Sequence, residues 1–119
     1  MPAQPPAPGQ TTAADAHDLA RSAGAVLLDV RDAAEYAAGH APGAVHLPLV
    51  ALAAGAPLPP VFEGRTVLAI CRSGNRSQRA AELLTARGAT VLNVTGGMTA
   101  WAHAGLPVTT PGGDAGLVI

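Results

Sequence analysis

The chain has 119 residues and a formal net charge of −1, which suits one domain and gives no basic excess for binding nucleic acid. All seven basic side chains are arginines, so Schiff-base chemistry on a lysine is excluded. The single cysteine excludes an internal disulfide and any paired-cysteine metal or redox motif, and it is typical of a reducing compartment. We therefore expect a cytoplasmic domain without nucleic-acid or membrane partners.

The composition of the two ends differs from that of the middle. The first ten residues hold four prolines, and the last ten contain glycine-rich turns without a helical pattern. We predict a disordered proline-rich tail at residues 1–11, one domain at 12–109 and a flexible tail at 110–119. Residues 41–62 lack charged side chains, but their five prolines would interrupt a membrane-spanning helix, so we expect a folded connection with one short helical turn.

Apolar runs and helix signals alternate along the chain. In order, they predict a helix at 12–22, a strand at 25–30, a helix at 32–38, strands at 44–47 and 66–70, a helix from 75 or 76 to about 87, a strand at 91–94 and a last helix that opens at 96–97. Strands that are continuous apolar runs and alternate with helices predict an α/β fold with a mostly parallel sheet. In such sheets ligands bind beyond the carboxyl ends of the strands.

The only cysteine, Cys71, stands at such a position, between a predicted strand and a predicted helix. A glycine allows a tight turn here, backbone N–H groups at the start of the helix form an anion site, and two arginines add positive charge. These features favour the thiolate and predict a nucleophilic cysteine, whereas the alternative is a small buried residue that ends a core strand. The residues of the predicted binding loop are Arg72, Ser73, Gly74, Asn75, Arg76 and Ser77.

The loop resembles the active-site loop of single-domain rhodaneses, which are thiosulfate sulfurtransferases. Other segments match the family's motifs in the same order: LDVR at 28–31, EY at 35–36, GHAPGA at 39–44, GGM at 96–98, AW at 100–101 and GLPV at 105–108. The likeness spans residues 15–108. It departs from the family at Ala41, where isoleucine is usual, and at His46, where asparagine is common.

The resemblance implies a three-layer α/β/α rhodanese fold and sulfur transfer through a persulfide. Cys71 would take the outer sulfur of thiosulfate or a related donor, and the N–H groups of the loop would hold the resulting sulfur anion. Arg76 would support the loop and the anion, and Arg72 would receive the negatively charged donor. Cyanide, an external thiol or a thioredoxin-like protein would then accept the sulfur, with ping-pong kinetics and no cofactor.

Three alternatives remain. Phosphatases and arsenate reductases that share the fold have a C-x5-R loop, whereas Cys71 and Arg76 give the shorter C-x4-R, which suits a single sulfur better than a phosphate. A non-catalytic sulfur-carrier or binding module is the second alternative, although such domains commonly lack the cysteine. A Cys–His pair of the peptidase kind is the third, but no histidine lies near the loop in the sequence.

The remaining polar and aromatic residues receive structural interpretations. We expect a buried polar network that fastens the first crossover to the sheet and consists of Asp29, Arg31, Glu35 and His40. The four histidines show no paired metal-ligand spacing, so no metal site is predicted. Trp101 is expected to be a core anchor of the last helix.

Overall fold

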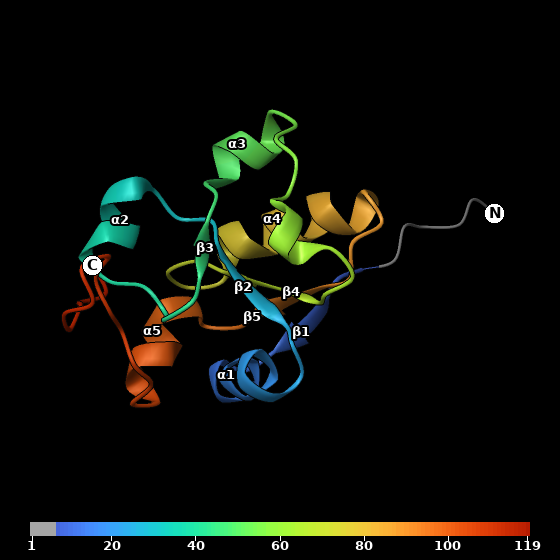
Figure 1. Ribbon diagram of the computed structural model, residues 1–119. Helices are drawn as coiled ribbons and strands as arrows, with labels where there is room; N and C mark the ends of the chain where they lie inside the picture. Colours follow the sequence, from blue (N-terminus) through green and yellow to red (C-terminus); the bar gives the residue numbers. More distant parts are fainter. Residues whose placement is uncertain (1–6) are drawn as a thin grey trace.

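The computed structural model describes residues 7–119. Strands and helices alternate in this range, as the sequence predicts (Figure 1). The elements are β1 (Gly9–Thr11), α1 (Ala13–Ser22), β2 (Val26–Asp29), α2 (Ala33–Ala38), β3 (Val45–His46), α3 (Leu49–Ala53), a 3-10 turn (Pro60–Phe62), β4 (Val67–Ile70), α4 (Asn75–Ala86), β5 (Val91–Val94) and α5 (Gly97–His103).

The five strands form one sheet in the order β1-β5-β4-β2-β3, and every neighbouring pair is parallel. Because every neighbouring pair is parallel, all five strands point the same way and their carboxyl ends share one edge of the sheet. Each connection between them is therefore a crossover. All four residues of β4, the central strand, are buried. The end of β4 is therefore the middle of the edge at which ligands bind in such sheets.

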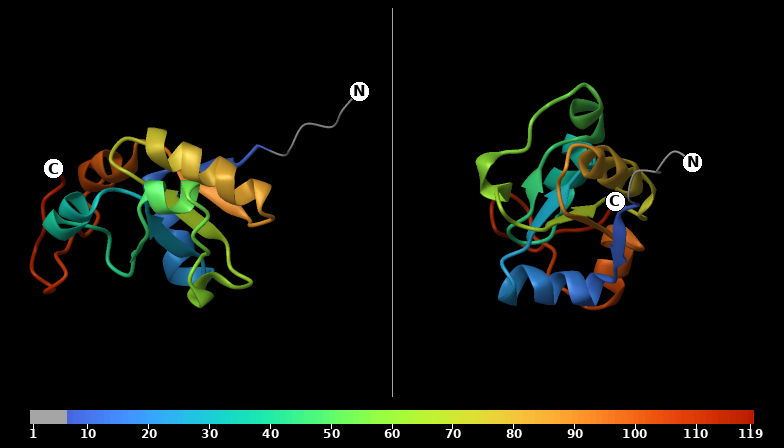
Figure 2. Two further views of the ribbon diagram at one scale, coloured as in Figure 1. Left: turned by 90° about the horizontal axis from the view of Figure 1, so that it is seen from above. Right: turned by 90° about the vertical axis from the view of Figure 1, so that its right-hand side faces the viewer.

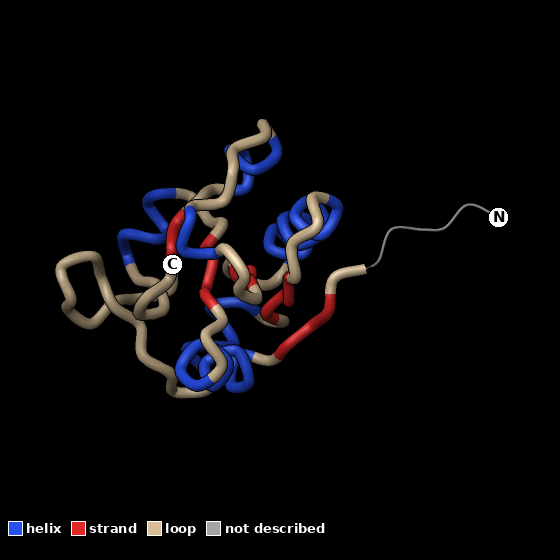
Figure 3. The backbone as a smooth tube through the Cα atoms, turned by 45° about the vertical axis from the view of Figure 1, so that its right-hand side comes forward, coloured by secondary structure: helices blue, strands red, loops and turns tan. Residues whose placement is uncertain are grey.

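Helices cover both faces of the sheet, and each face has its own hydrophobic core. Helices α1 and α5 lie on one face and α3 and α4 on the other, with α2 beyond the end of the sheet (Figures 1 and 2). One core gathers residues of α1, α5 and the adjoining sheet face, and the other gathers residues of α3, α4 and the opposite face. Figure 3 shows the strands enclosed between the helices. The predicted three-layer α/β/α architecture is confirmed, and the sheet is entirely parallel.

The N-terminal end differs from the predicted tail. Residues 1–6 lie outside the described range, but residues 9–11 form β1, whose Gly9 pairs with Leu92 of β5. The Thr11 carbonyl accepts a hydrogen bond from the Thr95 backbone N–H at 2.9 Å. The strand has no apolar run of its own, and its order comes from pairing with a strand that lies some eighty residues away in sequence.

The C-terminal segment also differs from the predicted flexible tail. The backbone N–H of Leu117 donates to Ala38 of α2, and that of Gly116 donates to Val108, both at 2.9 Å. Val118 packs against the core that contains α1 and α5. These contacts hold the segment against the domain. No helix in residues 7–119 has both the length and the apolar character needed to cross a membrane.

Candidate active site

Cys71 directly follows β4 and lies at the base of a turn that leads into α4. Its exposed fraction is 1%, and α4 begins four residues later at Asn75. Gly74 makes the turn possible because its φ of +107° lies in the left-handed region, and a Cβ there would come within 3.3 Å of the Gly96 backbone nitrogen. The structure thus places the cysteine between strand and helix, as predicted.

Two groups from the start of α4 donate to the Cys71 sulfur. The Gly74 backbone N–H lies 3.1 Å from Sγ, and the Ser77 hydroxyl lies 3.2 Å from it. Burial raises the pKa of the Cys71 thiol, but hydrogen bonds from the Ser77 hydroxyl and from the backbone N–H groups of Ser77, Gly74 and Ser73 outweigh it, so the pKa is lowered. The sulfur is therefore buried in an environment that favours the thiolate, which is the reactive form of cysteine.

The start of α5 holds the other side of the loop. The backbone N–H groups of Met98 and Thr99 donate to the carbonyls of Cys71 and Arg72, at 2.7 and 3.0 Å. Gly97 allows this approach, because a Cβ at that position would lie 2.3 Å from the Cys71 carbonyl oxygen. Gly96 and Gly97 were expected to open a helix and to match a family motif, and the tandem glycine after a strand was the signal for this close backbone contact.

Arg76 and Glu35 form an ion pair that joins the loop to α2. The two terminal nitrogens of Arg76 bond the two carboxylate oxygens of Glu35 at 2.7 and 2.8 Å. The hydrogen bonds from Arg76 hold the pKa of Glu35 at about 2, and the same contact raises the pKa of Arg76. Glu35 is thus a partner of the active-site loop, which differs from the network predicted for it. Arg76 holds the loop through this pair.

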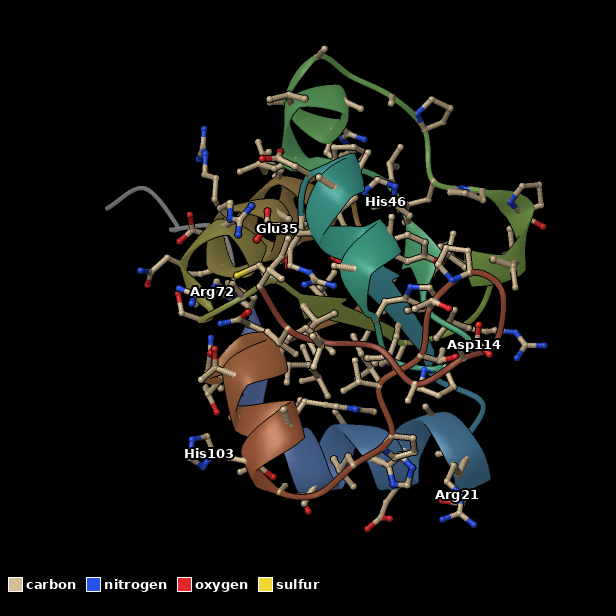
Figure 4. All side chains as sticks on the ribbon, turned by 90° about the vertical axis from the view of Figure 1, so that its left-hand side faces the viewer. Arg21, Glu35, His46, Arg72, His103 and Asp114 are labelled. Carbon is tan, nitrogen blue, oxygen red and sulfur yellow. The ribbon has the colours of Figure 1, made fainter. Side chains whose placement is uncertain are left out.

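Arg72, Ser73 and Asn75 form the exposed rim of the loop. Figure 4 shows Arg72 and Glu35 on the side of the molecule that faces the viewer. The Nε of Arg72 donates to the main-chain oxygen of Ile119 at 3.0 Å, so the C-terminal segment reaches the rim. A shallow hollow of about 290 Å³ adjoins the loop and is lined in part by Ser73, Asn75 and Thr95.

The rest of the predicted polar network divides into two parts. Arg31 bonds Asp29 with both Nε and Nη2, and Nη2 also donates to the Gly39 carbonyl at 2.7 Å. His40 does not join them, because its Nδ1 lies 2.8 Å from the Tyr36 carbonyl and its ring stacks on that of Tyr36. Of the four residues of the expected network, the structure brings Asp29 and Arg31 together and leaves Glu35 and His40 with other partners.

Trp101 anchors α5 in the core, as predicted. It is 1% exposed, and its indole N–H donates to the Pro107 carbonyl at 2.8 Å. A larger groove of about 450 Å³ lies beside it, between α1 and the first half of β2. Cys71 does not line this groove.

Two residues that the sequence analysis did not select also reach the site. Asn93 of β5 accepts a hydrogen bond from the Ser77 hydroxyl at 2.6 Å and donates to the Gly74 carbonyl at 3.3 Å. It also donates to the side chain of Gln10 on β1 at 3.0 Å. A buried asparagine inside the apolar run 91–94 was the only signal for this role, and nothing in the sequence pointed to Gln10.

A family model described as the rhodanese-like domain matches residues 12–104, which include the cysteine loop and the start of α5. The chain belongs to the rhodanese-like family. This rhodanese-like chain is 40% identical over 96 residues to a sulfurtransferase of Allochromatium vinosum, covering 80% of the chain and 88% of the relative. It is 39% identical over 102 residues to the thiosulfate sulfurtransferase GlpE of Pseudomonas putida, covering 82% and 87%.

A solved structure has the same fold. The rhodanese-related protein of Thermoplasma volcanium superimposes with a TM-score of 0.76 at 28% identity, covering 85% of this chain and 97% of that protein. Relatives named as sulfurtransferases and a matching family model together support a rhodanese-type enzyme at the level of the family.

Proposed function

We propose that this rhodanese-like domain is a sulfurtransferase that carries sulfur as a persulfide on Cys71. The observation that carries the proposal is the environment of the only sulfhydryl, where the Gly74 N–H and the Ser77 hydroxyl stand 3.1 and 3.2 Å from the sulfur. These donors stabilise negative charge on a sulfur that is otherwise buried. Sulfurtransferase-named relatives at about 40% identity point to the same reaction.

In the first half-reaction the Cys71 thiolate attacks the outer sulfur of thiosulfate. A new S–S bond forms, the bond between the two sulfurs of thiosulfate breaks, and sulfite leaves with the electron pair. The product is the Cys71 persulfide anion, and the total charge is unchanged. Loop N–H groups at residues 72–77 bind the outer sulfur, and the exposed Arg72 attracts the dianionic donor.

In the second half-reaction a nucleophile attacks the outer sulfur of the persulfide. The S–S bond to Cys71 breaks, its electron pair returns to Sγ, and the acceptor leaves as thiocyanate or as a new persulfide. Because the chain has one cysteine, the accepting thiol must come from another molecule, either a small thiol or a thioredoxin-like protein. A reducing compartment such as the cytoplasm supplies such thiols and is part of the proposal.

The geometry favours this reaction over phosphate chemistry. A phosphatase would use the loop arginine to bind the phosphate, whereas both terminal nitrogens of Arg76 bond Glu35. A binding module without chemistry would not need the donors that lower the pKa of Cys71. Hydrolysis of a phosphate ester by the wild type would favour the phosphatase, and the absence of both activities would favour the binding module.

The test is sulfur transfer from thiosulfate to cyanide by the wild type and by Cys71→Ser. We expect turnover in the wild type and a loss of at least about a thousandfold in the variant, because the reaction then lacks its nucleophile. The matched control is the double variant Cys71→Ser/Ser22→Cys, which moves the thiol to the exposed end of α1 and should stay inactive. Wild-type turnover in Cys71→Ser would contradict the proposal.

A further inference from the structure

The Ser77 hydroxyl has one proton and two acceptors within reach. Its oxygen lies 2.6 Å from Asn93 Oδ1 and 3.2 Å from the Cys71 sulfur. A serine hydroxyl can donate one hydrogen bond at a time. Ser77 is fully buried and Asn93 is 4% exposed, so solvent has little access to supply the missing donor. The two acceptors therefore compete for the same proton.

The orientation of the Asn93 amide is fixed by its other partners. Its Nδ2 donates to the Gly74 carbonyl at 3.3 Å and to Oε1 of Gln10 at 3.0 Å, both of which can only accept. The Gln10 amide nitrogen donates in turn to Gln78 at 2.8 Å, which fixes the Gln10 side chain. Oδ1 of Asn93 therefore faces Ser77 as an acceptor.

Counting protons gives a different arrangement for each state of the sulfur. In the thiol state, the Cys71 S–H donates to the Ser77 oxygen while the Ser77 hydroxyl donates to Asn93, and every group has a partner. In the thiolate state the sulfur has no proton to donate to Ser77 and is a stronger acceptor than the neutral Asn93 oxygen, so the Ser77 hydroxyl turns to the sulfur. Asn93 Oδ1 then loses its donor while it remains buried, which costs free energy.

We propose that Asn93 is a positioning residue that competes with Cys71 for the Ser77 hydroxyl, so that the hydroxyl turns to the sulfur only when the sulfur is charged. The competition restrains the free thiolate. The persulfide sulfur that is bonded to Cβ is neutral, and the hydroxyl then returns to Asn93. When an acceptor thiolate takes the outer sulfur, the electron pair of the broken S–S bond returns to Cys71 and the hydroxyl follows it. This catalytic consequence rests on the proposed function, but the competition itself does not.

The charged groups around the loop stay in place in every variant of the test. Arg72 and Arg76 come from the loop and α4, Asp32 and Glu35 from α2 and its cap, and the Asp29–Arg31 pair from the end of β2. A change in the ionisation of Cys71 therefore reports on the hydroxyl rather than on a lost charge.

The experiment follows thiolate absorbance against pH in the intact protein, with Cys71→Ala as the blank. Since the chain has one cysteine, the difference signal belongs to Cys71 alone. We expect Ser77→Ala to raise the thiol pKa by about one unit and Asn93→Leu to lower it by about half a unit to one unit, the size of one hydrogen bond to a charged group. Thr95→Val, which removes a hydroxyl bond at the end of β5 without touching Asn93, should leave the pKa unchanged.

The decisive comparison is Asn93→Leu in the Ser77→Ala background, where it should have no effect on the pKa. An equal shift in both backgrounds, or a rise in the pKa of Asn93→Leu alone, would overturn the proposal and make Asn93 a support of the Gly74 turn. Asn93→Ala serves if the leucine variant does not fold, because it also removes the competing oxygen without adding a charge and should lower the pKa in the same way. No sulfur donor enters the experiment, so failure of the sulfurtransferase proposal would leave its result unchanged.

Discussion

Two arginine–carboxylate pairs each have a carboxylate in residues 29–35, yet they differ in burial and in the sequence separation of their partners. Arg31 pairs with Asp29, two residues away, and both side chains are fully buried. Arg76 pairs with Glu35 across 41 residues, and the two side chains keep exposed fractions of 35% and 16%. The Asp29–Arg31 pair joins two residues close in sequence at the end of β2, and Arg31 also donates to the Gly39 carbonyl. The Arg76–Glu35 pair instead connects α2 with the cysteine loop.

The difference in burial predicts that the Asp29–Arg31 pair supports folding and that the Arg76–Glu35 pair supports turnover. Removal of one partner of a fully buried pair is strongly destabilising, because the other partner is left as an uncompensated buried charge. A partly exposed pair contributes little free energy in water, but it can fix the position of the loop that it joins. We expect substitutions in the first pair to affect folding and substitutions in the second to affect turnover.

The largest effect is expected for Arg31→Ala. The substitution leaves the Asp29 carboxylate buried without its partner and should lower the free energy of unfolding by about 3–5 kcal/mol. This is a large part of the stability of a small domain, so the variant will be partly unfolded or expressed as aggregates. Urea unfolding followed by circular dichroism measures the change, and a loss below about 1 kcal/mol would contradict the assignment of this pair to stability.

Glu35→Gln should show the opposite pattern. The free energy of unfolding should fall by about 1 kcal/mol or less, because the pair is partly solvated. The kcat for sulfur transfer should fall about tenfold, because a small displacement of the loop misplaces the nucleophile. Arg76→Gln should behave alike, and the double variant should be no worse than either single one. A loss of stability as large as that of Arg31→Ala, with kcat unchanged, would reverse the comparison.

The acid side of the stability profile tests the same pair. Glu35 has an ordinary pKa of 4.5 and a pKa of about 2 in the folded state, so its contribution is fully present above pH 4.5 and is lost as the pH falls toward 2. The difference in free energy of unfolding between the wild type and Glu35→Gln should therefore shrink between those values. Urea unfolding of both proteins at a series of pH values would show a constant difference if the carboxylate had no partner.

The comparison also shows what the sequence could predict. Strands β2, β4 and β5 could be predicted from apolar runs, and a reactive role for Cys71 could be predicted from its place between a strand and a helix, because these signals are local. The partner of Glu35 was missed because Arg76 lies 41 residues away in the sequence. Glu35 was assigned to the polar network, and the resemblance gave Arg76 the support of the loop and the anion without naming Glu35. Strand β1 was missed because its pairing with β5 is its only source of order. Asn93 was missed for the same reason, since its importance lies in contacts with two other segments, the cysteine loop and β1.

The smallest effect is expected at the rim of the loop. Arg72→Ala removes an exposed charge and its bond to the Ile119 oxygen, so it should raise the KM for thiosulfate by about two- to fivefold, the effect of one solvated charge pair. The kcat should change little, because the loss applies equally to ground and transition states. Steady-state kinetics at low and high salt measure this, and a fall in kcat larger than that of Glu35→Gln would show that Arg72 acts on the reacting sulfur.

The most direct test of the persulfide is the intact mass of the protein after treatment with thiosulfate under non-reducing conditions. The wild type should gain the mass of one sulfur atom and lose it again when cyanide or a thiol is added. Cys71→Ser should gain nothing, and Glu35→Gln should gain the sulfur more slowly. A wild-type mass that does not change with thiosulfate, or a gain that Cys71→Ser shares, would contradict sulfur transfer through Cys71.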